Sequence, residues 1–98
     1  MGAVRARSFE YMKCLIADDD PRIRLLLISL LEGPGWKFLE AGCGIEALSL
    51  YDTHGPDLVI MDIEMNPMDG ITAMRAMRER HTTCKVLMVS QHDSSRFR

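Results

Sequence analysis

Short apolar runs alternate along the chain with stretches of helical periodicity, and this alternation restricts the fold more than any other feature of the sequence. The apolar runs fall at residues 14–17, 36–41, 58–61 and 85–90, and the helical stretches lie between them at 21–31, 44–51 and 71–80. The runs at 14–17 and 58–61 are apolar at every position, which is typical of strands buried on both faces of a parallel sheet. The order β-α-β-α-β-α-β therefore predicts an α/β fold with a doubly wound parallel sheet, right-handed crossovers and helices on both faces.

The first helical stretch has the clearest boundaries. Asp20 and Pro21 are typical of an N-cap and a first helical position, and Gly33 follows the end of the stretch. Its apolar residues recur at helical spacing and predict a stripe that faces the core, made of Ile23, Leu26, Leu27, Leu30 and Leu31. Leu25 and Ile28 lie outside that stripe, so the helix is apolar nearly all round, as buried helices are.

The length and composition exclude several classes of protein. A chain of 98 residues and 11.1 kDa allows one small domain. Its formal net charge of −2 provides no basic field for nucleic acid, and no apolar run approaches the roughly 20 residues that cross a bilayer. The cysteines, Cys14, Cys43 and Cys84, form no CxxC pair, which argues against a disulfide framework and against a zinc site. We therefore expect a cytoplasmic protein that binds neither nucleic acid directly nor a membrane.

Acidic residues follow two of the predicted strands. Asp18 and Asp19 come directly after the first strand, and Asp62 ends the third. If these two strands are neighbours, the carboxylates converge on the crevice where doubly wound sheets bind ligands. Two carboxylates about 5 Å apart repel by roughly 3 kcal/mol at an effective dielectric constant of about 20, and a hard divalent ion such as Mg²⁺ relieves this repulsion. The cluster indicates a metal-assisted phosphoryl site with one carboxylate acting as nucleophile. The alternative is a solvated loop of turn and capping residues, which we prefer for Asp20 alone.

Three segments resemble the receiver domain of two-component response regulators. They are residues 16–21 (IADDDP), 61–70 (MDIEMNPMDG) and 86–90 (VLMVS), and they occur in the order that this family shows. The resemblance covers residues 13 to 90. It implies a flavodoxin-like sheet with strand order 2-1-3-4 and a signalling module rather than an enzyme.

The resemblance also assigns roles to individual residues. It implies that Asp62 is the phosphoacceptor, modified by a histidine kinase or a small phosphodonor, and that Ser90 is the switch hydroxyl. It implies Mg²⁺ as cofactor, with ligands from Asp18, Asp19, Asp62 and the backbone carbonyl of Glu64. A hydroxyl at the end of the fourth strand can donate to a phosphoryl oxygen, which agrees with the role of Ser90.

The loop beside Asp62 departs from the family pattern. The family usually has Met-Pro at this point, whereas Met65, Asn66 and Pro67 place the proline one residue later. Proline fixes its own φ and restricts the residue before it, so we expect a different loop shape near the site.

The phosphate-binding lysine of the family has no counterpart in this sequence. In the family the domain continues through a helix, a fifth strand that ends in this lysine, and a final helix. Lys13, Lys37 and Lys85 each begin a strand, and a five-residue strand separates its two ends by roughly 16 Å. The lysines are therefore expected at the wrong edge of the sheet. The arginines that approach the site more easily are Arg22, Arg96 and Arg98.

These departures lead to an expected division of the chain and to an expected assembly. Residues 1–12 show no clear periodicity and are assigned to a leader or flexible arm, and residues 13–98 to a receiver domain truncated after the fourth strand. The fourth strand would then be an open edge and the first helix would be partly uncovered. Both features predict a homodimer or higher oligomer through the strand-four edge or the first helix.

Two other functions compete with phosphate signalling. One is a degenerate or truncated receiver that acts only as a protein-interaction or dimerisation module. The other is a phosphohydrolase with an aspartate nucleophile, which fits poorly because such enzymes carry a second aspartate where Glu64 stands.

Overall fold

Parallel strands and helices alternate throughout the computed structural model, which describes residues 11–90. The strands are β1 (Met12–Ala17), β2 (Trp36–Ala41), β3 (Leu58–Asp62) and β4 (Val86–Val89). The helices are α2 (Pro21–Leu31), α3 (Gly44–His54) and α4 (Gly70–Arg80). The strands form one sheet in the order β2-β1-β3-β4, and every neighbouring pair is parallel. The predicted α/β fold and strand order are confirmed.

The ends of the elements differ slightly from the prediction. β1 begins at Met12, a residue expected at the end of the leader. α3 runs three residues beyond the predicted end at Tyr51, because Gly55 ends it in the left-handed conformation with φ of 56°. α2 begins as predicted, since Asp20 caps it by accepting the backbone N–H of Arg22 and Pro21 is its first residue.

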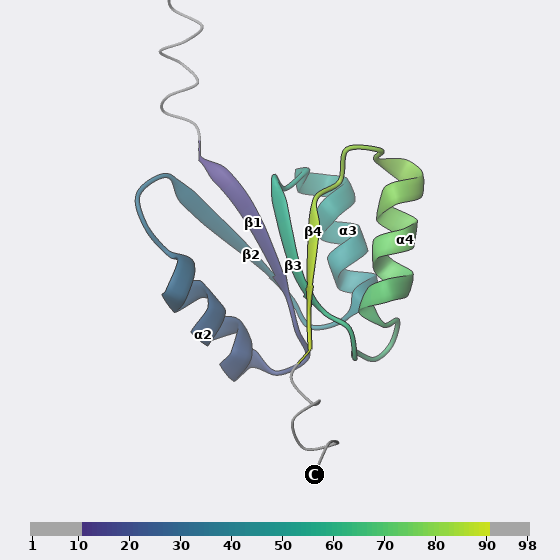
Figure 1. Ribbon diagram of the computed structural model, residues 1–98, viewed down its shortest axis with the longest axis horizontal. Coiled ribbons are helices and arrows are strands. Elements are labelled where there is room, and N and C mark those ends of the chain that lie inside the picture. The colour runs from purple at the N-terminus through teal and green to yellow at the C-terminus, as the bar shows by residue number, and fades with distance from the viewer. Residues whose placement is uncertain (1–10, 91–98) are drawn as a thin grey trace, which may run out of the picture.

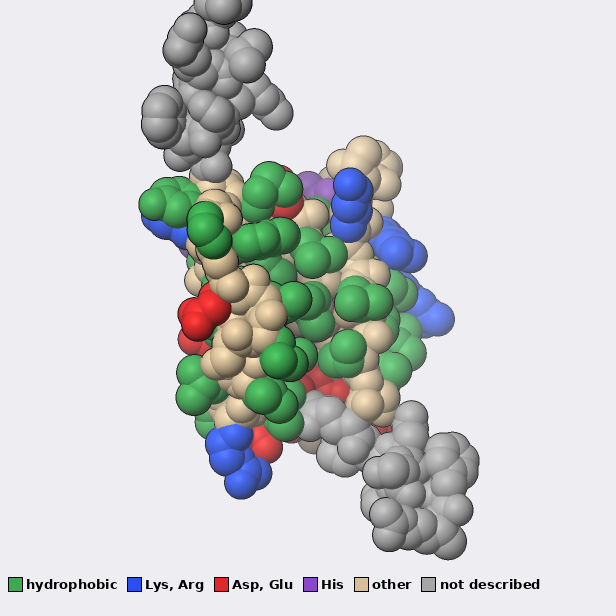
Figure 2. All heavy atoms as spheres, turned by 60° about the vertical axis from the view of Figure 1, so that its left-hand side comes forward, with side chains coloured by type: hydrophobic (Ala, Val, Ile, Leu, Met, Phe, Trp, Pro, Cys, Tyr) green, Lys and Arg blue, Asp and Glu red, His purple; other side chains and the backbone are tan. Residues whose placement is uncertain are grey.

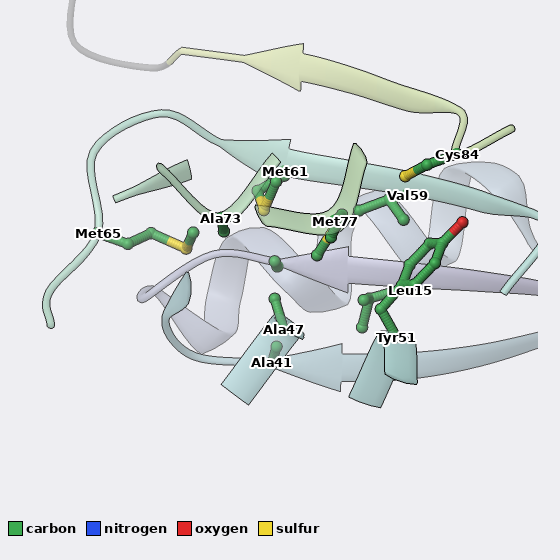
Figure 3. Close-up of a cluster of buried hydrophobic side chains, with 11 residues drawn as sticks. Leu15, Ala41, Ala47, Tyr51, Val59, Met61, Met65, Ala73, Met77 and Cys84 are labelled. Atoms are coloured by element: carbon green, nitrogen blue, oxygen red, sulfur yellow. The ribbon is translucent and has the colours of Figure 1, made fainter. Parts of the chain in front are cut away.

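The helices cover the two faces of the sheet unequally. α3 and α4 lie together on one face and α2 lies on the other (Figure 1). The larger core lies on the α3 and α4 side, where Leu15 and Val59 of the sheet meet Ala47, Tyr51 and Met77 of the helices (Figure 3). Methionines pack into or against this core, as the apolar pattern predicts, at Met61, Met65, Met68, Met74, Met77 and Met88.

The packing of α2 corrects the predicted core stripe. Leu27 and Ile28 pack on the smaller core formed by Cys14, Ile16 and Ile60, although Ile28 was expected on the outer side. Four leucines of this helix are exposed, and all of them except Leu25 were expected in the core: Leu25 (65%), Leu26 (53%), Leu30 (71%) and Leu31 (41%). Within residues 11–90, α2 is the only helix on its face of the sheet, and it contacts the sheet along one narrow line. None of its residues is fully buried, so the expectation of a helix buried nearly all round is wrong.

The face between α2 and β4 is apolar. Figure 2 shows hydrophobic side chains spread across it, with acidic side chains at its lower end. Leu87 of β4 is 54% exposed on the molecular surface, and a small cavity is lined by Cys14, Leu31, Trp36, Phe38 and Leu58. Among the described residues, no helix combines the length and the apolar character needed to cross a membrane.

Candidate metal centre

The sheet register brings the predicted acidic residues together. Ala17 of β1 pairs with Met61 of β3, so Asp18 and Asp62, the next residues along, lie side by side. Both aspartates have no exposed surface, whereas Asp19 is exposed. One carboxylate oxygen from each of Asp18, Asp19 and Asp62 lies within 4.8 Å of the others. The predicted convergence at the carboxyl ends of the first and third strands is confirmed.

Burial and like charge act together on Asp18. Desolvation raises the pKa of this carboxyl above its usual range, and the neighbouring charges of Asp62, Asp19 and Asp20 raise it further. The backbone N–H of Asp20 donates to Asp18 Oδ1 at 2.8 Å and opposes these effects. The cluster therefore holds negative charge that a cation would stabilise.

The donor atoms fit a hard dication. Carboxylate and carbonyl oxygens are the ligands that Mg²⁺ prefers, commonly one or two carboxylates with several waters. The cluster supplies carboxylates from two buried residues and one exposed residue, which leaves one side open to water or phosphate. The residues present therefore fit Mg²⁺.

The β3–α4 loop is fastened beside Asp62. The backbone N–H of Glu64 points to Asp62 Oδ1 at 3.4 Å, and the N–H of Gly70 donates to the carbonyl of Ile63 at 2.9 Å. Met65 is buried, Asn66 and Pro67 are exposed, and the peptide bond between Asn66 and Pro67 is cis. The displaced proline thus lies in an exposed part of the loop that follows Asp62.

The loop is also tied to the start of α3. The N–H of Gly44, at the start of α3, donates to the carbonyl of Met68 at 2.9 Å, and Met68 has φ of 65°. A Cβ at Gly44 would collide with that carbonyl, so glycine allows the two segments to approach. The site is therefore framed by residues from the starts of α3 and α4.

Ser90 lies at the same edge of the sheet as the acidic cluster. Asp62 pairs with Val89, and the N–H of Ile63 donates to the Val89 carbonyl at 3.1 Å, so Ser90 is the next residue beyond this pair. Ser90 is exposed. Its assignment as the switch hydroxyl stays a prediction.

The lysines lie at the opposite edge, as predicted. Lys13 Nζ donates to the carbonyl of His54 at the far end of α3, at 3.1 Å, and Lys37 Nζ lies 4.7 Å from the centre of the Tyr11 ring. Lys85 directly precedes β4. Arg22 is engaged by Asp20 at 2.9 Å, and the other candidate arginines, Arg96 and Arg98, lie outside the described residues.

Sequence reasoning missed Arg24. This side chain donates from Nη1 to the backbone carbonyl of Asp18 at 2.6 Å and from Nε to Glu40 Oε1 at 2.9 Å. The available signal was a charged residue within a leucine-rich helix, which is typical of a side chain held by a specific partner. The partner itself depends on how α2 lies against β2, and spacing alone does not supply it.

The arrangement defines a class of protein. A parallel α/β sheet in the order 2-1-3-4, with carboxylates gathered where β1 and β3 end, is a flavodoxin-like module with an acidic pocket at the carboxyl ends of its strands. The sequence matches the family described as response regulator receiver domain over residues 14–98, and the chain belongs to this family.

Curated relatives agree with this assignment. The chain is 37% identical over 79 residues to the chemotaxis protein CheY of Bacillus subtilis, which covers 80% of this chain and 66% of that protein. It is 31% identical over 80 residues to the sporulation initiation phosphotransferase F of the same organism, covering 82% of this chain and 64% of that protein. The chain thus spans about two thirds of the length of these relatives.

Solved structures agree as well. The response regulator TrrA of Thermotoga maritima, in complex with Mg²⁺-BeF, matches with a TM-score of 0.77 and 32% identity, covering 87% of this chain and 74% of that one. The CheY of the Borrelia burgdorferi CheX-CheY-BeF3-Mg complex matches with a TM-score of 0.80 and 28% identity, covering 92% of this chain and 70% of that one.

Proposed function

We propose that this receiver domain accepts a phosphoryl group on Asp62 from a histidine kinase or a small phosphodonor, in a reaction that requires Mg²⁺. The acidic cluster is the observation that carries the proposal. In it, a carboxylate oxygen of buried Asp62 lies within 4.8 Å of carboxylate oxygens of Asp18 and Asp19. The similarity to TrrA, a protein solved with Mg²⁺-BeF, supports Mg²⁺ as the cofactor.

The chemistry is a transfer between two groups. A carboxylate oxygen of Asp62 forms a bond to phosphorus, and the bond from phosphorus to the donor breaks, a P–N bond for a phosphohistidine or a P–O bond for a small acyl phosphate. The electron pair leaves with the imidazole or the carboxylate of the donor. When bound, Mg²⁺ would supply positive charge that neutralises the phosphoryl oxygens and the acidic cluster.

Each residue of the cluster has its own task. Asp19 and Asp62, with the backbone carbonyl of Glu64, would hold Mg²⁺, and Asp18 would support the site from its buried position. The Glu64 N–H beside Asp62 Oδ1 at 3.4 Å orients the acceptor carboxylate.

The product of the reaction is a changed surface. The Ser90 hydroxyl would donate to a phosphoryl oxygen, and its movement would carry the end of β4 with it, because Ser90 directly follows Val89. Output then passes to a protein partner rather than to a substrate, so the domain is a switch and not an enzyme. We place it in the cytoplasm, where a histidine kinase would act on it.

The position of the lysines favours a second candidate function. Lys13, Lys37 and Lys85 all lie at the amino-terminal ends of the strands, away from Asp62, so none of these three would contact a phosphoryl group on Asp62. A transfer that depended on one of them would be poor. The domain would then serve only as an interaction or dimerisation module.

Mass spectrometry after incubation with acetyl phosphate and Mg²⁺ separates the two functions. An adduct that appears on the wild type, and is absent from Asp62→Asn and from samples with EDTA, supports phosphate signalling. A wild type without an adduct, under conditions that label another receiver domain, supports the interaction module.

We further propose that the protein is a homodimer or higher oligomer. The supporting features are the exposed leucines of α2 and β4, which pairs only with β3 among the described residues.

A further inference from the structure

The side chain of Arg24 joins three elements of the fold next to the acidic cluster. It begins on α2, reaches the end of β1 at the carbonyl of Asp18, and contacts Glu40 of β2. It is only 19% exposed, although leucines of the same helix are more than half exposed. This charged residue is therefore one of the better-held side chains of α2.

These contacts fix the backbone just before Asp19. The N–H of Asp18 donates to the carbonyl of Ala41 at 3.0 Å, and its carbonyl accepts Arg24 Nη1 at 2.6 Å. Because the peptide bond is planar, the carbonyl of Asp18 and the N–H of Asp19 turn as one unit. A guanidinium that holds this carbonyl consequently sets the direction in which the chain presents Asp19.

The effect of Arg24 is one of position rather than of charge. Its positive charge is balanced by Glu40 at 2.9 Å, and it meets the main chain of Asp18 rather than the carboxylate. The guanidinium presents several N–H groups in a rigid plane, so one side chain satisfies both partners. A lysine has a single ammonium group on a flexible stem and does not reproduce this geometry.

We propose that Arg24 is a positioning residue that clamps the Asp18–Asp19 peptide and thereby orients Asp19 toward the divalent cation. The inference rests on the proposed function only in that the cluster binds Mg²⁺. Residues that orient metal ligands typically change affinity by about tenfold or more when they are replaced.

The test compares two arginines of the same helix. Arg24→Met removes the clamp, and Arg22→Met is the matched control, because Arg22 is exposed and pairs only locally with Asp20. Titration calorimetry with MgCl₂ on the full chain should give a dissociation constant about tenfold weaker for Arg24→Met and unchanged for Arg22→Met.

A second measurement needs no metal. Hydrogen exchange of the Asp20 amide, which donates to Asp18 Oδ1, should be faster in Arg24→Met than in Arg22→Met in the presence of EDTA. If Arg24→Met does not fold, Arg24→Lys and Glu40→Gln take its place, with the same two measurements and a smaller weakening of Mg²⁺ binding.

The outcomes separate the clamp from the metal site. Variants of Arg24 and Glu40 that lose stability but keep the wild-type affinity for Mg²⁺ would overturn the positioning role. A wild type that produces no Mg²⁺ binding signal would instead overturn the proposed metal site, and the inference with it.

Discussion

Gly70 lies directly against the main-chain carbonyl of Asp62. A Cβ at position 70 would overlap the carbonyl oxygen of Asp62 and would come within 3.0 Å of its carbon and of the Met88 methyl group. The start of α4 thus packs against the end of β3, at the residue that carries the candidate phosphoacceptor. Only glycine permits this distance, so the sequence Asp69-Gly70 combines a helix cap with a close approach.

Replacing Gly70 with alanine should therefore disturb both stability and the site. Main-chain atoms of Asp62 cannot yield as a flexible side chain would, so we expect Gly70→Ala to lower the free energy of unfolding by about 2 kcal/mol, in the range of overpacked cores. We also expect slower formation of the Asp62 adduct. Urea unfolding measures the first effect, and mass spectrometry with acetyl phosphate measures the second.

Gly33→Ala is the control for this prediction. No atom lies within 4 Å of a Cβ at Gly33, which follows α2 in an exposed turn. Its substitution should leave both measurements close to the wild-type values, and equal effects at the two glycines would contradict the role of close approach at Gly70.

Asp18→Asn should make the metal-free protein more stable at neutral pH. The pKa of Asp18 is raised, chiefly by burial, so its contribution to stability is complete below the ordinary carboxyl value of 3.8 and is lost as the pH rises through the folded value. Asparagine lacks this titration but keeps an oxygen for the Asp20 N–H. In EDTA, the stability advantage of the variant should grow between acidic and neutral pH.

In excess Mg²⁺, the wild type should become more stable than Asp18→Asn. A ligand that binds only the folded state stabilises it, and the wild type has the complete set of carboxylates. Thermal unfolding with and without excess MgCl₂ should show a larger rise in Tm for the wild type. An Asp18→Asn protein that is less stable than the wild type in EDTA from pH 4 to pH 7 would refute this explanation.

The sequence predicted the sheet and the acidic cluster because both follow from local patterns. Fully apolar runs mark the strands, and the parallel arrangement sends the residues that follow β1 and β3 to one edge. The sequence was a poorer guide to burial where contacts between helices and strands decide which side chains are exposed. Leu26 and Leu30 fit a core stripe by spacing, yet they are exposed, because α2 meets the sheet along Leu27 and Ile28.

The contacts of Arg24 illustrate a different limit. A hydrogen bond from a side chain to the carbonyl of Asp18 leaves no periodic pattern, and its partner Glu40 lies on a strand whose distance from α2 is set by tertiary packing. The motif gave the identity of the acidic residues, whereas the support of those residues became visible only in three dimensions.

Acid should weaken the contact between α3 and α4 through Asp52. Its carboxylate accepts hydrogen bonds from His81 Nε2 at 3.0 Å and from Arg80, and these partners, His81 first, lower the pKa of Asp52. A lowered pKa contributes stability above pH 3.8 that is lost as the pH falls through the folded value.

Asp52→Asn should consequently have a lower Tm than the wild type at pH 7. The difference in Tm between the two proteins should become smaller as the pH falls below 4. Glu79→Gln, on the exposed surface of α4, is the matched control and should follow the wild-type curve. Parallel curves for Asp52→Asn and the wild type from pH 7 to pH 2 would show that the contact does not titrate.

The exposed surface of α2 suits a second copy of the same helix. Leu25, Leu26 and Leu30 form its apolar part, and the hydroxyl of Ser29 on the same helix already donates to the carbonyl of Leu25 at 2.8 Å. In an antiparallel pair related by a twofold axis, the exposed leucines of one helix would pack against those of the other. We expect this contact to produce the proposed dimer.

The double variant Leu26→Gln/Leu30→Gln should then be a monomer by size-exclusion chromatography with light scattering, at concentrations where the wild type is a dimer. Because both side chains are exposed, its free energy of unfolding should change by no more than about 0.5 kcal/mol for each substitution, measured in dilute solution where the wild type is dissociated. Leu27→Ala, at the sheet contact, should instead lose stability.

A dimer that survives the double variant but dissociates with Leu87→Lys would place the contact at the β4 edge. A wild type that is monomeric at all concentrations would refute dimerisation through either surface.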